Sequence, residues 1–262
     1  MNLDFTDRHA LVCGASQGIG RACAMELALL GASVTVLARH ADALQQLVLD
    51  LPCTNAAQQH DFLVADSADT DGLRRAAREL VTKHPVHILV NNTGGPSPGP
   101  VHGAQIDAFL AAYRMHLIAN HALAETVIPG MQAAGYGRIV NIISTSVKEP
   151  IAGLGVSNTT RWAVASWAKT LAAELAPFGI TVNNVLPGST NTRRIEQIVA
   201  TRAQKSGASV ADTQQAMEAE VPARRFAEPA EIAAAVAFLA SPAAAYINGQ
   251  ELKVNGGLDW AP

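Results

Sequence analysis

Three glycines near the start of the chain have the spacing of a phosphate-binding loop. Gly14, Gly18 and Gly20 lie in "LVCGASQGIGRA", after a short apolar run and at the start of a helical pattern. Gly14 permits a tight turn, and without Cβ atoms Gly18 and Gly20 let backbone N–H groups and a helix N-terminus approach a pyrophosphate. A glycine triplet between a strand and a helix predicts a dinucleotide-binding site.

The end of the second apolar run indicates which dinucleotide binds. "VTVLAR" places Arg39 where NAD-binding sites carry a carboxylate for the ribose 2′-hydroxyl, and the next acid is Asp42. Because a guanidinium can hold a phosphate with two hydrogen bonds, Arg39 favours NADP(H) over NAD(H) as the cofactor. The alternative is that Arg39 is only a surface residue at the end of a strand.

The elements that must position these residues alternate along the chain. Runs of ten or more residues rich in Ala and Leu lie between most of the short β-branched runs, which we interpret as buried strands. These runs are residues 9–14, 33–38, 61–65, 86–92, 138–144, 180–186 and 250–254. The alternation predicts an α/β fold: one Rossmann-like domain over residues 1–262, with a doubly wound parallel sheet of about seven strands and helices on both faces.

One polar segment departs from this alternation. Residues 190–225 follow directly on the carboxyl end of a predicted strand, where open α/β sheets bind their ligands. We interpret the segment as a lid over a substrate pocket. The alternative is a solvated helical excursion with no role in binding.

Composition excludes several other functions. The net charge is −3 and the basic residues are scattered, which gives no general attraction to nucleic acid or anionic membranes. No apolar run reaches transmembrane length, and the N-terminus lacks an apolar signal core. Cys13, Cys23 and Cys53 have no metal-ligand spacing. We interpret them as reduced core thiols and expect a cytoplasmic protein with no metal, nucleic-acid partner or membrane partner.

The chain resembles the short-chain dehydrogenase/reductase family over essentially its whole length. The motifs that carry the resemblance occur in order: "CGASQGIG", "VADS", "NNTGG", "GRIVNIIS", "ITVNNVLPGSTNT" and "RRFAEPAEIAAAVAFLAS". The pattern is most similar to the 3-oxoacyl-[acyl-carrier-protein] reductase branch. The resemblance implies a homodimer or homotetramer that acts on a small carbonyl or acyl-thioester substrate.

The resemblance also implies which residues bind the cofactor. Asp66 should meet the adenine, the segment from Asn92 to Gly94 the adenine ribose, and Thr192 the nicotinamide carboxamide. The full set that the resemblance and the motifs imply is Gly14, Ser16, Gln17, Gly18, Ile19, Gly20, Arg39, Asp66, Ser67, Asn92, Thr93, Gly94, Arg161, Pro187, Gly188, Thr190 and Thr192.

The family's catalytic set of Asn, Ser, Tyr and Lys is altered in this chain. Ungapped spacing from the intact motifs places His116 at the Asn position and Ser144 at the Ser position. The Tyr position holds Ser157 and the Lys position, one helical turn later, holds Arg161. A small alignment gap would not restore the phenol, because none of the tyrosines lies between residue 144 and the helix; they are Tyr113, Tyr136 and Tyr246.

The substitutions predict a low activity or an altered proton relay. A serine hydroxyl is a much weaker acid than a phenol, and Arg161 keeps its proton at physiological pH. General acid catalysis is typically worth about 10²–10⁴-fold in rate. Our hypothesis is that His116 supplies the proton, directly or through a water held by Ser157. The alternative is that His116 only fills space on a central helix.

Two functions fit these observations. The first is an NADP(H)-dependent oxidoreductase that transfers hydride to or from a ketone or secondary alcohol, with Ser144, Ser157, Arg161 and His116 at its catalytic site. The second is a catalytically silent NADP-binding protein, either a redox sensor or a structural subunit. The retained Ser144 and the segment 190–225 favour the enzyme.

Overall fold

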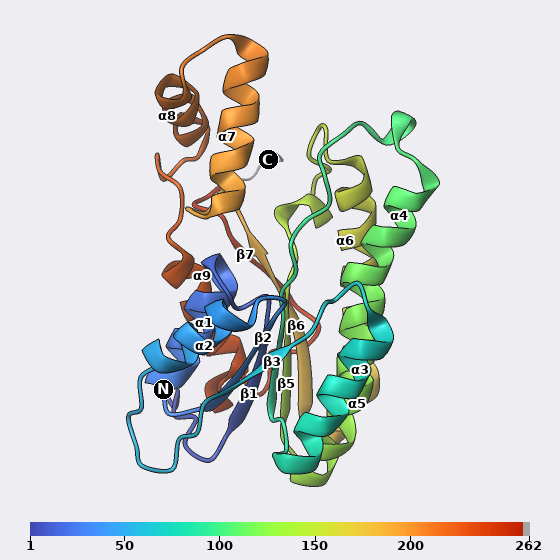
Figure 1. The fold of residues 1–262 in the computed structure, drawn as a ribbon, viewed down its shortest axis with the longest axis vertical. Coiled ribbons are helices and arrows are strands. Elements are labelled where there is room, and N and C mark those ends of the chain that lie inside the picture. The colour runs from blue at the N-terminus through green and yellow to red at the C-terminus, as the bar shows by residue number, and fades with distance from the viewer. Residues whose placement is uncertain (259–262) are drawn as a thin grey trace.

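A computed structural model describes residues 1–258, and a seven-stranded parallel sheet forms its centre (Figure 1). The strand order is β3-β2-β1-β4-β5-β6-β7, and every neighbouring pair is parallel. The strands are β1 His9–Cys13, β2 Ser33–Ala38, β3 Asp61–Val64, β4 Ile88–Asn91, β5 Gly137–Ile142, β6 Ile180–Pro187 and β7 Glu251–Val254. This confirms the predicted α/β fold and its seven strands. The last four residues of the predicted domain 1–262 lie outside the described residues.

Helices cover both faces of the sheet (Figure 1). Helices α1, α2 and α9 pack on one face, and α3, α5 and α6 pack on the other. The helices are α1 Gly18–Leu29, α2 Ala41–Asp50, α3 Thr70–Lys83, α4 Ile106–Tyr113, α5 Ala119–Ala134, α6 Gly155–Leu175, α7 Arg193–Ser206, α8 Val210–Glu220 and α9 Pro229–Ala240. Helices α7 and α8 stand beyond the carboxyl ends of the strands, apart from both layers.

Alternating strand residues build the two halves of the core. Val12 and Val90 pack towards α1 and α9, whereas Leu11 and Leu89 pack towards α3 and α5. Successive side chains of a strand point to opposite faces, so a strand covered on both faces must be apolar at every position. This is why the central strands read as continuous apolar runs in the sequence.

Three asparagines fix the register of β4, β5 and β6 near the carboxyl ends of these strands. Asn91, Asn141 and Asn184 stand opposite one another on β4, β5 and β6. The Asn91 amide donates to Asn141 Oδ1 at 2.9 Å, and the Asn141 amide donates to Asn184 Oδ1 at 3.0 Å. Buried amides are costly unless they are hydrogen-bonded, so a one-residue slip of β5 would leave these groups unpaired. The ladder therefore determines where the loops leave the sheet.

The structure bears on the interpretation of the three cysteines as core thiols. Cys13 and Cys23 are buried as expected, but Cys53 is exposed, so its interpretation as a core thiol is wrong. Cys53 follows Pro52 in the loop between α2 and β3. Within residues 1–258, no helix is long and apolar enough to cross a membrane.

Candidate active site

The glycine loop between β1 and α1 has a backbone that only glycine adopts easily. Gly14 and Gly18 have φ angles of 59° and 57°. A Cβ on Gly14 would lie 2.5 Å from the Asn92 carbonyl oxygen, and a Cβ on Gly20 would lie 2.3 Å from the Gly14 carbonyl oxygen. Because L side chains clash in such positions, the glycines allow the loop to pack directly against the end of β4.

The N-terminus of α1 is left open for an anion. Its N-cap residue, Gln17, makes no side-chain capping hydrogen bond, and the first turn contains no acid. The first N–H groups of a helix have no partner within the helix, and together with the helix dipole they favour a phosphate. Thr192 stands opposite, since a Cβ on Gly18 would lie 3.2 Å from its Cγ2 atom. These residues fit a dinucleotide pyrophosphate.

A hollow of about 370 Å³ lies at the carboxyl ends of β2 and β3. Within residues 1–258, the Arg39 guanidinium is exposed and forms no ion pair or hydrogen bond. It is therefore available to a phosphate. Asp69 caps α3 by accepting a hydrogen bond from the Gly72 N–H at 3.0 Å. The hollow is lined by Arg39, Val64, Ala65, Asp66, Asp69 and Gly72.

Arg161 joins three elements at the carboxyl ends of the central strands. It lies on α6 and is only 8% exposed. Its Nη1 atom donates to the Ile142 carbonyl oxygen at 3.0 Å, and its Nη2 atom donates to the Thr93 carbonyl oxygen at 3.4 Å. Ile142 ends β5 and Thr93 follows β4, so one guanidinium ties α6 to the ends of two central strands.

His116 lies in a π-helical turn, Arg114–Ile118, between α4 and α5. Such turns are rare and occur frequently at functional sites. The ring is 1% exposed, and its Nδ1 atom shares a hydrogen bond of 2.5 Å with the Thr93 hydroxyl. Its Nε2 atom is buried and has no partner among residues 1–258. Thr93 thus contacts Arg161 through its carbonyl group and His116 through its hydroxyl group.

Burial determines the charge states of His116 and Arg161. It lowers the pKa of His116 to about 2, and the neighbouring Arg161 charge adds to the effect. Burial also lowers the pKa of Arg161 to about 10, with the nearby charge of Arg194 contributing. At neutral pH the imidazole is therefore neutral and the guanidinium remains charged. This disfavours the hypothesis that His116 supplies a proton directly.

The two serines of the predicted catalytic set lie on different elements. Ser144 follows β5, and its Oγ atom accepts a hydrogen bond from the Ser146 N–H at 3.1 Å. Ser157 lies in the first turn of α6 and is half-buried. Its hydroxyl makes no hydrogen bond within residues 1–258. Ser157 and Arg161 are four residues apart, so they lie on the same side of the helix.

Sequence reasoning missed Arg194, whose side chain reaches from α7 to the loop after β4. Arg194 lies in the first turn of α7, and its Nη2 atom donates to the Pro96 carbonyl oxygen at 3.0 Å. This contact connects the segment 190–225 to the loop after β4. A basic residue in a polar segment carries no distinguishing signal, so only the three-dimensional arrangement reveals the contact.

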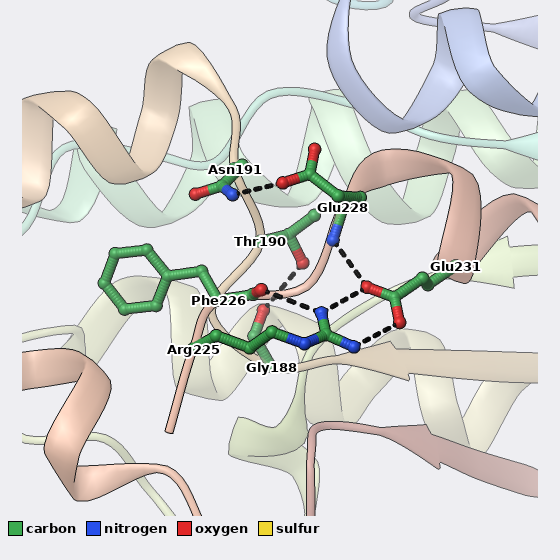
Figure 2. Close-up of polar contacts among 7 residues, drawn as sticks. All are labelled: Gly188, Thr190, Asn191, Arg225, Phe226, Glu228 and Glu231. Atoms are coloured by element: carbon green, nitrogen blue, oxygen red, sulfur yellow. Dashed lines mark hydrogen bonds and ion pairs between the residues drawn. The ribbon is translucent and has the colours of Figure 1, made fainter. Parts of the chain in front are cut away.

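The segment 190–225 begins and ends at neighbouring places in the fold, and polar contacts hold its two ends together (Figure 2). The Asn191 N–H donates to the Ala227 carbonyl oxygen at 2.8 Å, and the Ala227 N–H donates to the Ser189 carbonyl oxygen at 2.9 Å. Arg225 holds Glu231 through two hydrogen bonds of 2.6 Å. We call these contacts the lid base, because residues 190–225 are the segment that the sequence predicts to be a lid.

Comparison with known proteins identifies the family. A family model described as enoyl-(acyl carrier protein) reductase matches residues 14–259, and the chain belongs to the short-chain dehydrogenase/reductase family. An NADPH-dependent reductase, BacG of Bacillus subtilis, is 29% identical and covers 95% of this chain and 97% of its own. The 3-oxoacyl-[acyl-carrier-protein] reductase FabG of Vibrio cholerae is 34% identical, and the match covers 98% of this chain and 99% of FabG.

Solved structures agree with this assignment. L-Sorbose reductase from Gluconobacter frateurii, in complex with NADPH and L-sorbose, superposes with a TM-score of 0.93 at 28% identity, and both chains are fully covered. BacG, FabG and L-sorbose reductase are all named as reductases. The comparisons therefore support an oxidoreductase and do not favour the catalytically silent alternative.

Proposed function

We propose that the protein is an NADP(H)-dependent oxidoreductase that reduces a ketone or oxidises the corresponding secondary alcohol. The observation that carries this proposal is the open N-terminus of α1 together with the free guanidinium of Arg39. The first suits a pyrophosphate and the second suits a ribose 2′-phosphate. Relatives of this family that are named as NADPH-dependent support the same cofactor.

The four residues at the catalytic positions have separate roles in this proposal. NADPH, when bound, supplies the hydride that reaches the carbonyl carbon. Ser144 and Ser157 donate hydrogen bonds to the carbonyl oxygen, and the buried charge of Arg161 stabilises the negative charge that develops on it. His116 is neutral, so it positions Thr93 rather than acting as an acid.

The proton that completes the reduction comes from solvent in this proposal. The alkoxide oxygen receives it from a water through the Ser157 hydroxyl, which is free of other hydrogen bonds in the described residues. Arg161 holds its charge throughout and passes no proton. A relay without a phenol is expected to be slower than one with it, since a serine hydroxyl is a poor acid.

We further propose that the segment 190–225 acts as a lid over the substrate. The contact from Arg194 to the loop after β4 supports this role, since it joins α7 to a loop at the carboxyl ends of the strands. Assembly as a homodimer or homotetramer and a cytoplasmic location remain predictions from the family resemblance and the sequence.

One assay set tests the proposed function. We expect NADPH oxidation by at least one member of a panel of 3-oxoacyl thioesters, diketones and quinones. A double variant, Ser157→Tyr with Arg161→Lys, restores the family pattern and measures how far the native site is weakened. Binding of NADPH without turnover of any carbonyl compound would contradict the enzyme and support a silent binding protein.

A further inference from the structure

Arg194 spans the gap between the lid and the body of the protein. It projects from the first turn of α7 to the loop after β4, where it donates to the Pro96 carbonyl oxygen. A Cβ added to Gly95 would lie 3.8 Å from its Nη2 atom, so the guanidinium lies close against this loop. One hydrogen bond uses only part of its capacity, since a guanidinium has five N–H donors.

Two positive charges lie close together here without a counter-charge. Arg194 is near enough to lower the pKa of the buried Arg161. Within residues 1–258, neither guanidinium forms an ion pair with a carboxylate. Charges removed from water are unfavourable unless they are paired, so this pair of arginines is arranged to gain from a bound anion.

The phosphates of the cofactor already have partners elsewhere. The open N-terminus of α1 suits the pyrophosphate, and Arg39 at the end of β2 suits the 2′-phosphate. Arg194 lies instead against the loop after β4 and close to Arg161, which the proposed function places at the reacting carbonyl group. An anion at this point therefore belongs to the substrate.

We propose that Arg194 binds a carboxylate of the substrate, so that the enzyme acts on an oxo acid and its hydroxy-acid counterpart rather than on a neutral ketone. The inference rests on the proposed oxidoreductase function and names its substrate class. Arg194 is half-buried, which strengthens a charge-assisted hydrogen bond relative to one in open solvent. Because Arg194 is part of the lid, carboxylate binding also draws the lid onto the loop after β4.

Matched pairs of acid and ester test this proposal. NADPH oxidation is measured with acetoacetate against methyl acetoacetate, levulinate against methyl levulinate and phenylpyruvate against its methyl ester. We expect Arg194→Gln to lower kcat/KM for the acids by about 10–100-fold, mainly through KM, and to change the esters by less than about two-fold. The charge-retaining Arg194→Lys recovers part of the loss. The neighbouring exposed Arg193, changed to Gln, is the matched control and leaves both unchanged.

Other outcomes overturn the inference. An equal loss for acids and esters would show that Arg194 only holds the Pro96 loop in place. A weaker dissociation constant for NADPH in Arg194→Gln would show that it binds a cofactor phosphate. If no carbonyl compound is turned over, the oxidoreductase proposal fails independently of the carboxylate site. Calorimetric titration of acetoacetate into the NADP⁺-saturated protein then tests the carboxylate site separately. If acetoacetate binds the unaltered protein and this binding is lost in Arg194→Gln, the proposed carboxylate site is supported. If acetoacetate does not bind the unaltered protein, the site is contradicted.

Discussion

At the scale of single residues, Thr93 is the point at which the unusual catalytic groups meet. Its hydroxyl contacts His116, and its carbonyl group contacts Arg161. The family resemblance assigns Thr93 to the adenine ribose alone. The structure adds contacts of Thr93 with two of the three residues that differ from the family's usual set.

The depressed pKa of His116 predicts the pH dependence of catalysis. Since burial lowers its pKa to about 2, no group at this position titrates near pH 6.5. We expect kcat to show no ionisation step between about pH 5 and 8, and His116→Asn to retain the shape of the profile. The measurement is kcat against pH under saturating NADPH. A step near pH 6.5 that disappears in His116→Asn would restore His116 as the proton donor.

Some site residues could be predicted from the sequence and others could not. The turn of the glycine loop was predictable because its backbone requires glycine at fixed spacing, and the place of Arg39 was predictable because it directly follows a clear apolar strand. The state of His116 was not predictable, since its pKa depends on burial and on the charge of Arg161. Arg194 was missed because its contact with Pro96 joins segments nearly a hundred residues apart in sequence.

At the scale of elements, the strands were the most predictable feature. Each is short, β-branched and bounded by turn residues, so periodicity and composition identified all seven. The π-helical turn Arg114–Ile118 has no comparable signal, because it differs from an α-helix only in its hydrogen-bond spacing. Helices α7 and α8 were not predicted individually, because the sequence indicated only a polar segment that we interpreted as a lid, with a solvated helical excursion as the alternative.

The lid base should control the mobility of α7 and α8. Replacing Arg225 by Gln removes both hydrogen bonds to Glu231 (Figure 2). We expect faster amide hydrogen exchange at Asn191 and Ala227, whose backbone groups pair across the lid base, with central strands unchanged. Mass spectrometry of exchanged peptides provides the measurement.

The control for this experiment lies within the lid itself. Arg202→Gln removes an ion pair between α7 and α8 that does not join the ends of the segment. It should leave exchange at the lid base unaltered. Equal acceleration in both variants would mean that the lid is held by its own packing and not by Arg225.

At the scale of the whole molecule, four histidines gather near the amino ends of the central strands, opposite the site. His9 contacts His84 ring to ring, with centroids 5.4 Å apart. The Nδ1 atom of His87 accepts the His9 N–H at 3.1 Å, and Nδ1 of His60 accepts the Val34 N–H at 3.2 Å. A ring nitrogen that accepts a hydrogen bond carries no proton, so the fold holds these two imidazoles neutral.

This cluster predicts that the fold is sensitive to acid. Burial lowers the pKa values of His60 and His87 and brings that of His9 to about 4. The unfolded chain therefore binds more protons than the folded chain below about pH 6.5, and stability falls from there towards pH 4. The melting temperature should decline over this range. His87→Asn should flatten the decline, because an amide can accept the His9 N–H but cannot be protonated, whereas His102→Asn on the surface should not. An unchanged slope in His87→Asn would contradict this account.

The central claim is that the open end of α1 and Arg39 bind NADP(H), and an equilibrium titration of reduced coenzyme, followed by its fluorescence, tests it most directly. We predict saturation by NADPH at roughly micromolar concentrations, weaker binding of NADH, and a loss of about ten-fold or more in NADPH affinity for Arg39→Ser with NADH unaffected. Absence of binding by either coenzyme at about millimolar concentration would contradict the account.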